Sequence, residues 1–267
     1  MTFFQALVLG TLQGLAEFLP ISSSAHLALA PWLFGWQEPG LPFDVALHVG
    51  TLISVLVYFR AEWVKLWHAA LNILRTHRVE GTEEKRVVLL VIATIPGVIG
   101  GILLQKQAES AFRAPWLIAV TLIAMGVLLW LVDSAARQTR SMDQITAGDA
   151  LLIGVAQVAA LIPGVSRSGA TITMGRALSL DRAAAATFSF LMSMPIIAGA
   201  AVFEGRHLLH SPALGWPLLV GVAASAVSGW LAIDVLLRYV TQRSYGVFAL
   251  YRFVLGVIVL VLVFERA

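Results

Sequence analysis

Two short polar segments interrupt an otherwise apolar sequence, and they carry most of the side chains that can do chemistry. The first segment, residues 13–26, holds Glu17, Ser23 and His26. A carboxylate, a hydroxyl and an imidazole this close together can move a proton and activate a nucleophile. Pro20 ends the helix that carries Glu17, and the serines after it can cap the next helix. Because free N–H groups at a helix start attract anions, this segment predicts acid–base work on a phosphate or a carboxylate.

Three more polar residues of this segment are candidates for binding the substrate. Gln13 lies four residues before Glu17, so the two side chains share one face of a helix. Ser22 and Ser24 flank Ser23 and offer hydroxyls at the start of the following helix. Helix capping, or a hydrogen bond between helices, would also explain each of these residues, so the sequence leaves both interpretations open.

The second segment, residues 163–171, predicts another anion site, this time with a fixed positive charge. Arg167 stands between Ser166 and Ser168, and Thr171 follows one helical turn later. A guanidinium group is planar and matches the oxygens of a phosphate, and the hydroxyls can add hydrogen bonds. An arginine between serines inside an apolar segment has almost no purely structural explanation. Two such sites that meet near the middle of a membrane would suit a diphosphate better than a single carboxylate.

The composition restricts the class of protein that can hold these segments. Of the 267 residues, 59% are hydrophobic and only 12% are charged, whereas an ordinary soluble domain has about 25% charged residues. This excludes a soluble enzyme, a disordered chain and a nucleic-acid-binding domain, because too few polar residues remain to cover a surface. Continuous apolar runs favour helices over a barrel. The sequence therefore predicts a single all-α polytopic membrane domain, residues 1–267, in contact with membrane lipids.

Eight apolar stretches are long enough to enter a bilayer, and two of them are interrupted. About 20 apolar residues cross the hydrocarbon core as a helix. The interrupted stretches, 2–33 and 150–178, contain the two polar segments and are predicted to be re-entrant helical hairpins, since bare backbone at membrane depth needs protein or water around it. The other stretches predict about six transmembrane helices at 43–59, 87–104, 116–132, 183–203, 216–237 and 247–264.

The two halves of the chain show a weak internal repeat. Moving the sequence by 144 residues aligns five identical pairs across the two hairpins, and both hairpins have the same order of helix, proline, serines and helix. We therefore predict an inverted-topology repeat, with its first copy at 1–133 and its second at 147–267. The five pairs are Gly10 with Gly154, Gln13 with Gln157, Ala16 with Ala160, Ser22 with Ser166, and Ser24 with Ser168.

Charge in the loops predicts how the protein is oriented. If both hairpins return to the side they entered, loops 60–86, 133–149 and 235–246 share one side of the membrane. An excess of Lys and Arg marks the cytoplasmic side, so this side is predicted to be cytoplasmic and both termini outside. The first side holds Arg60, Lys65, Arg75, Arg78, Lys85, Arg86, Arg137, Arg140, Arg238 and Arg243, and the other side holds Lys106, Arg113, Arg206 and Arg266.

The two motifs together resemble the signatures of the bacterial undecaprenyl-diphosphate phosphatase (bacitracin-resistance) family. The motifs are Glu-Phe-Leu-Pro-Ile-Ser-Ser-Ser-Ala-His from Glu17 and Pro-Gly-Val-Ser-Arg-Ser-Gly-Ala-Thr up to Thr171. The resemblance covers the whole chain, and it implies hydrolysis of a polyprenyl diphosphate in the bacterial plasma membrane during cell-wall synthesis. It also implies a divalent cation, expected to be Mg²⁺ with Glu17 as ligand, and a site open to the periplasmic side.

We expect Glu17, Ser23, His26 and Arg167 to be the catalytic residues. Arg167 would hold the diphosphate, Ser23 would attack it or bind it, and His26 would activate Ser23 or protonate the leaving group. A phosphoserine route and direct attack by water both stay open, and so does self-association of the protein.

The first motif departs from the family pattern at one position. Where the family usually has an acidic residue, this chain has Gln13, so Glu17 would carry the carboxylate role nearly alone. Asp44 and His48 are expected to be structural. A polyprenyl-phosphate flippase is the alternative function, since broken helices and inverted repeats are also typical of transporters. A flippase would use Arg167 and the serines, but it would not need a carboxylate, a serine and a histidine together.

Overall fold

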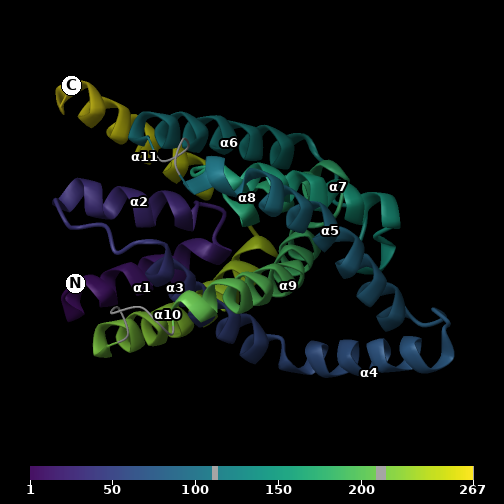
Figure 1. The fold of residues 1–267 in the computed structure, drawn as a ribbon. Helices are drawn as coiled ribbons and strands as arrows, with labels where there is room; N and C mark the ends of the chain where they lie inside the picture. The colour runs from purple at the N-terminus through teal and green to yellow at the C-terminus, as the bar shows by residue number, and fades with distance from the viewer. Residues whose placement is uncertain (110–113, 209–214, 267) are drawn as a thin grey trace.

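The computed structural model describes residues 1–109, 114–208 and 215–266, and in these ranges the chain is almost entirely helical (Figure 1). The predicted all-α polytopic fold is confirmed. The helices are α1 (Phe3–Phe18), α2 (Ser23–Phe34), α3 (Leu41–Tyr58), α4 (Arg60–Thr76), α5 (Thr82–Glu109), α6 (Pro115–Ala135), α7 (Ala147–Val158), α8 (Arg167–Ala177), α9 (Arg182–Leu208), α10 (Trp216–Val240) and α11 (Gly246–Arg266).

The predicted transmembrane helices correspond to α3, α5, α6, α9, α10 and α11. Five of them are long and apolar enough to cross a bilayer by themselves, and α3 meets the same criterion together with α4, from which a bend of 84° separates it. Many of their large apolar side chains are exposed, as lipid-facing residues must be. The protein is therefore a multi-pass membrane protein.

The two interrupted stretches form helix pairs of similar design. In the first, α1 begins at a capping box of Thr2 and Gln5, and a break after Phe18 leads into α2. In the second, α7 begins at a capping box of Thr146 and Asp149, and a break with a short 3₁₀ turn leads into α8. Such boxes satisfy the free N–H groups at a helix start.

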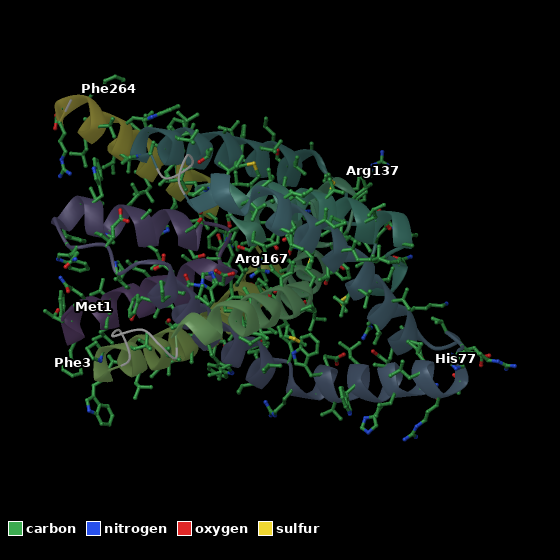
Figure 2. All side chains as sticks on the ribbon, in the orientation of Figure 1. Met1, Phe3, His77, Arg137, Arg167 and Phe264 are labelled. Atoms are coloured by element: carbon green, nitrogen blue, oxygen red, sulfur yellow. The ribbon has the colours of Figure 1, made fainter. Side chains whose placement is uncertain are left out.

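The ends of the molecule agree with the predicted layout. Figure 2 places Met1 and Phe264 at one end, His77 and Arg137 at the opposite end, and Arg167 midway between them. Two of the basic loops thus lie at the same end of the molecule, away from both termini, and α7 starts from that end whereas α1 starts from the other (Figure 1). Among the basic residues predicted outside, the side chains of Lys106, Arg113 and Arg206 fall outside the described residues.

Glycine contacts join the two halves of the chain. A β-carbon added at Gly10 of α1 would collide with the carbonyl oxygen of Gly221 in α10, and one added at Gly154 of α7 would collide with that of Ala93 in α5. Each hairpin thus packs its first helix against a helix of the other half, at backbone distance. Interlocked halves are what an inverted repeat requires, although its boundaries at 1–133 and 147–267 stay a prediction.

Replacing Gly10 with alanine is expected to destabilise the fold by about 1–3 kcal/mol, because backbone atoms of α10 have to move to admit the methyl group. The midpoint of thermal unfolding in detergent measures the effect. Gly101→Ala is the matched control, since no atom lies within 4 Å of a β-carbon added there. Equal unfolding midpoints for the two variants would show that α1 and α10 are not in tight contact.

Candidate active site

The two helix breaks touch one another near the middle of the molecule. The hydroxyl of Ser168 donates to the carbonyl oxygen of Leu19 at 3.1 Å, and the backbone N–H of Gly164 donates to the hydroxyl of Ser22 at 3.2 Å. Gly164 has a φ of 94°, and a β-carbon there would collide with Thr121, so this position requires glycine. The contact between the breaks brings the starts of α2 and α8 together.

Ser22 and Ser166 begin these two helices in the same unusual way. Their φ angles are 77° and 73°, values that few residues other than glycine adopt. Each hydroxyl accepts from the backbone N–H three residues later and pairs at 3.2 Å with a second serine hydroxyl, Ser24 in the first break and Ser168 in the second. The shared conformation turns the next residue of each motif, Ser23 or Arg167, into the space between the breaks.

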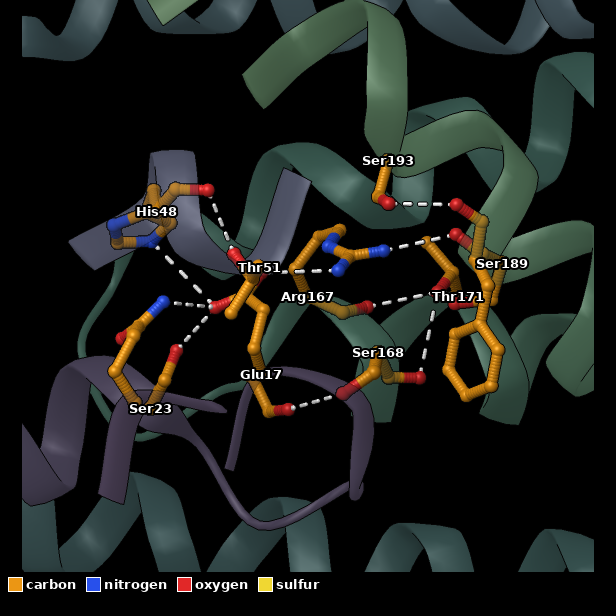
Figure 3. Close-up of polar contacts among 12 residues, drawn as sticks. Glu17, Ser23, His48, Thr51, Arg167, Ser168, Thr171, Ser189 and Ser193 are labelled. Carbon is orange, nitrogen blue, oxygen red and sulfur yellow. Dashed lines mark hydrogen bonds and ion pairs between the residues drawn. The ribbon is translucent and has the colours of Figure 1, made fainter. Parts of the chain in front are cut away.

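Glu17 lies at the centre of this space and receives hydrogen bonds from three helices (Figure 3). Its Oε2 accepts from Gln13 at 3.1 Å and from the hydroxyl of Ser23 at 2.6 Å, while its Oε1 accepts from Arg167 at 2.9 Å. The side chain is 6% exposed, so solvent screens the ion pair with Arg167 only weakly. The carboxylate of one hairpin therefore faces the guanidinium of the other, as predicted.

Arg167 has a second anchor besides Glu17. Its other terminal nitrogen donates to the carbonyl oxygen of Ser189 in α9 at 2.8 Å, and the hydroxyl of Thr171 bonds to that of Ser189 at 2.7 Å. The guanidinium is therefore fixed in position before any ligand binds. Preorganised donors of this kind stabilise a developing negative charge without a cost of reorientation.

His26 lies in the same region but does not reach Ser23. Its Nδ1 contacts the carbonyl oxygen of Ser22, and its Nε2 contacts the hydroxyl of Tyr251 in α11, both at 2.7 Å. The imidazole also stacks on the ring of Tyr251. The expected bond from His26 to Ser23 is therefore absent from this arrangement, because both ring nitrogens are already engaged. Instead, the hydroxyl of Ser23 donates its hydrogen bond to the carboxylate of Glu17.

The bond between His26 and Tyr251 predicts a mild phenotype for Tyr251→Phe. This change removes one hydroxyl and should lower turnover by about tenfold or less, because one hydrogen bond contributes about 0.5–1.5 kcal/mol. Release of phosphate from the expected diphosphate substrate measures it. A loss of more than about a hundredfold would instead mean that His26 acts directly on the reaction.

Several serines and threonines expected to bind the substrate are used by the protein itself. Ser22, Ser166, Ser168 and Thr171 are all less than 5% exposed, and their hydroxyls bond to backbone or to each other. Ser24 is exposed. Substrate binding by these five residues stays a prediction, but Ser22 and Ser168 already join the two breaks, Ser166 caps α8, and Thr171 bonds to Ser189 of α9.

Comparison with known proteins agrees with the two motifs. A family model described as bacitracin resistance protein BacA matches residues 6–258. The chain belongs to this family.

Curated relatives of this BacA family member are similar over their whole length. An undecaprenyl-diphosphatase of Gemmatimonas aurantiaca is 55% identical over 97% of both chains. Proteins of the same name from Pelotomaculum thermopropionicum and Moorella thermoacetica are 52% and 47% identical, over 100% of this chain and 98% and 100% of theirs.

This BacA family member brings one further side chain to the site that the sequence did not predict. His48 of α3 places its Nε2 3.5 Å from Oε2 of Glu17, and its Nδ1 bonds to the carbonyl oxygen of Asp44 at 2.7 Å. Its side chain is 34% exposed, far more than those of Glu17 and Arg167. A histidine within an apolar helix was the only signal, and it is equally typical of a packed residue.

The metal implied for the BacA family can be tested against the donor atoms. In the described residues, no three His, Asp or Glu side chains gather into a metal site. Glu17 supplies one carboxylate, and Oε1 of Gln13 is buried without a hydrogen-bond partner. Magnesium commonly binds one or two carboxylates together with phosphate oxygens of a substrate. The residues therefore fit a magnesium ion that arrives with a diphosphate, rather than one held by the protein alone.

Proposed function

We propose that this protein hydrolyses undecaprenyl diphosphate to undecaprenyl phosphate and inorganic phosphate in the bacterial inner membrane. The observation that carries the proposal is the contact of Ser23, Glu17 and Arg167 where the two hairpins meet. The names of its full-length relatives point to the same activity. A flippase is not favoured, because it would have no use for a serine that donates to a buried carboxylate.

In the proposed reaction, Ser23 and Glu17 act as nucleophile and base. The Ser23 oxygen attacks the terminal phosphorus while its proton passes to Oε2 of Glu17, and the bond from that phosphorus to the bridging oxygen breaks. Undecaprenyl phosphate leaves, and water then releases inorganic phosphate from the serine. In the alternative, Glu17 activates a water molecule and Ser23 only binds the phosphate. Capture of a phosphate on Ser23 distinguishes the two routes.

Arg167 stabilises the charge that builds up on the phosphoryl oxygens, and His48 flanks the entrance to the carboxylate. Glu17 and Oε1 of Gln13 are the groups that would hold magnesium beside the diphosphate. The bound ion would supply charge neutralisation to the phosphate oxygens. We propose that the site opens on the periplasmic side, as the resemblance of its two motifs to the family implies.

Purified protein in detergent should release phosphate from undecaprenyl diphosphate but not from undecaprenyl phosphate. EDTA should lower the rate at least about tenfold, because the diphosphate then lacks its counter-ion, and added Mg²⁺ should restore it. Malachite-green detection of phosphate measures both rates. No release with Mg²⁺ present would refute the proposed activity, and an undiminished rate in EDTA would refute only the metal.

A further inference from the structure

The described part of the chain holds two completely buried arginines, and they differ in one respect. Arg176 and Arg252 are both 0% exposed. The Nε of Arg176 pairs at 2.8 Å with Asp133, a carboxylate that Arg182 shares at 2.9 Å, so its charge has a counter-ion in direct contact. No salt bridge joins a described carboxylate to Arg252. A buried charge without a counter-ion is costly, and in a membrane protein such a residue is functional by default.

Arg252 lies where both helix breaks can be reached from α11. It donates to the carbonyl oxygen of Pro20 in the first break at 3.1 Å, and to those of Gly164 and Val165 in the second break at 2.6 and 2.9 Å. A further bond runs to Leu122 of α6 at 3.3 Å. Carbonyl dipoles satisfy its N–H groups, but they do not cancel its positive charge.

The position of Arg252 also explains a glycine of the second motif. A β-carbon added at Gly169 would lie 2.6 Å from a terminal nitrogen of Arg252. The guanidinium therefore packs directly against the first turn of α8, whose first residue is Arg167. Its charge therefore lies beside the first turn of α8 in a fully buried position, where solvent screens electrostatic interactions only weakly.

The charge balance of the site gives this buried cation a use. Arg167 and Glu17 neutralise one another in their ion pair. His48 also faces Glu17, but the charge of a histidine depends on its protonation, whereas an arginine always carries one. A diphosphate brings more negative charge than a monophosphate. Besides a magnesium ion that arrives with the diphosphate, a fixed positive charge that no carboxylate cancels would favour the more highly charged headgroup.

We propose that Arg252 is this charge: it binds both helix breaks through their carbonyl groups and makes the pocket prefer a diphosphate over a monophosphate. The inference rests on the proposed function and deepens it, since it assigns the discrimination between substrate and product headgroups. Arg252 is a positioning residue with an electrostatic effect, and it needs no contact with the reacting atoms.

The test uses full-length protein in nanodiscs, with inorganic diphosphate and inorganic phosphate as probes. In Arg252→Gln the affinity for diphosphate should fall by about tenfold more than the affinity for phosphate, because the more highly charged anion loses more from the missing charge. Arg252→Lys keeps the charge but loses most of the fork of hydrogen bonds. It should keep the ratio of the two affinities within about threefold of the wild type, even if the protein is less stable.

Arg176→Gln is the matched control, because Arg176 is equally buried but forms an ion pair with Asp133. It should lower the unfolding temperature and leave the ratio of affinities unchanged. An unchanged ratio in Arg252→Gln, or an equal collapse of the ratio in Arg252→Lys, would overturn the proposal. Failure of both Arg252 variants to fold would assign the residue to folding alone. Lipid phosphate release by the wild type tests the enzymatic function separately.

Discussion

Replacing Arg167 with glutamine is expected to lower turnover of undecaprenyl diphosphate by about a thousandfold or more. The guanidinium pairs with Glu17, and a second bond, to the carbonyl oxygen of Ser189, fixes its position. Positioned arginines that stabilise the transition state of phosphoryl transfer contribute about 10³–10⁵ in rate. Phosphate release at saturating substrate measures the loss, and most of it should fall on kcat.

The Arg167→Lys variant tests whether the positive charge of Arg167 is sufficient or whether its planar shape is needed as well. An ammonium group can reach Glu17 or Ser189 but cannot hold both in the planar fork, so we expect a rate between those of the glutamine variant and the wild type. Both variants leave the Glu17 carboxylate with weaker partners, so their unfolding midpoints must be compared as well. Near-normal kcat in a folded Arg167→Gln variant would remove this residue from the transition state.

The sequence predicted the meeting of Glu17, Ser23 and Arg167 because all three lie beside helix breaks. A break inside an apolar stretch has to be covered by protein, and the other break is the natural cover. The side chain of His26 was harder to place. Its spacing from Ser23 suggested a shared helix face, but the carbonyl of Ser22 and the hydroxyl of Tyr251 hold the ring elsewhere.

Residues supplied by the intact spanning helices could not be predicted in the same way. His48 reaches Glu17 because of how α3 is rotated about its axis. That rotation is set by small contacts: Gly50 faces Ser225 of α10, whose hydroxyl donates to the carbonyl oxygen of Leu47 at 2.8 Å. Asp44, His48 and Thr51 stand at helical spacing and mark a polar face of α3, but this pattern does not say which residues of other helices meet that face. Likewise, Arg252 within the apolar α11 predicts an inward-facing charge but not the groups that it contacts.

Replacing Glu17 with glutamine is expected to abolish turnover, with a loss of about a thousandfold or more. The amide keeps the size of the side chain and can still accept a hydrogen bond from Ser23, but it cannot take the proton. No second carboxylate replaces it, since its neighbour one turn earlier is Gln13. The change also removes the partner that neutralises Arg167. Affinity for inorganic diphosphate, measured without Mg²⁺, should therefore rise while kcat collapses.

A higher affinity for diphosphate together with a lower kcat is a result that a merely structural role of Glu17 would not produce. Glu62→Gln is the matched control, because Glu62 is a carboxylate of α4 that pairs with Lys65 at 2.8 Å far from the breaks, and both measurements should stay near wild type. Weaker diphosphate binding by Glu17→Gln without Mg²⁺ would contradict the neutralisation of Arg167, and a near-normal kcat in the folded variant would contradict the role as base. Ser23 would then have to lose its proton to another acceptor, of which His48 is the nearest to that carboxylate.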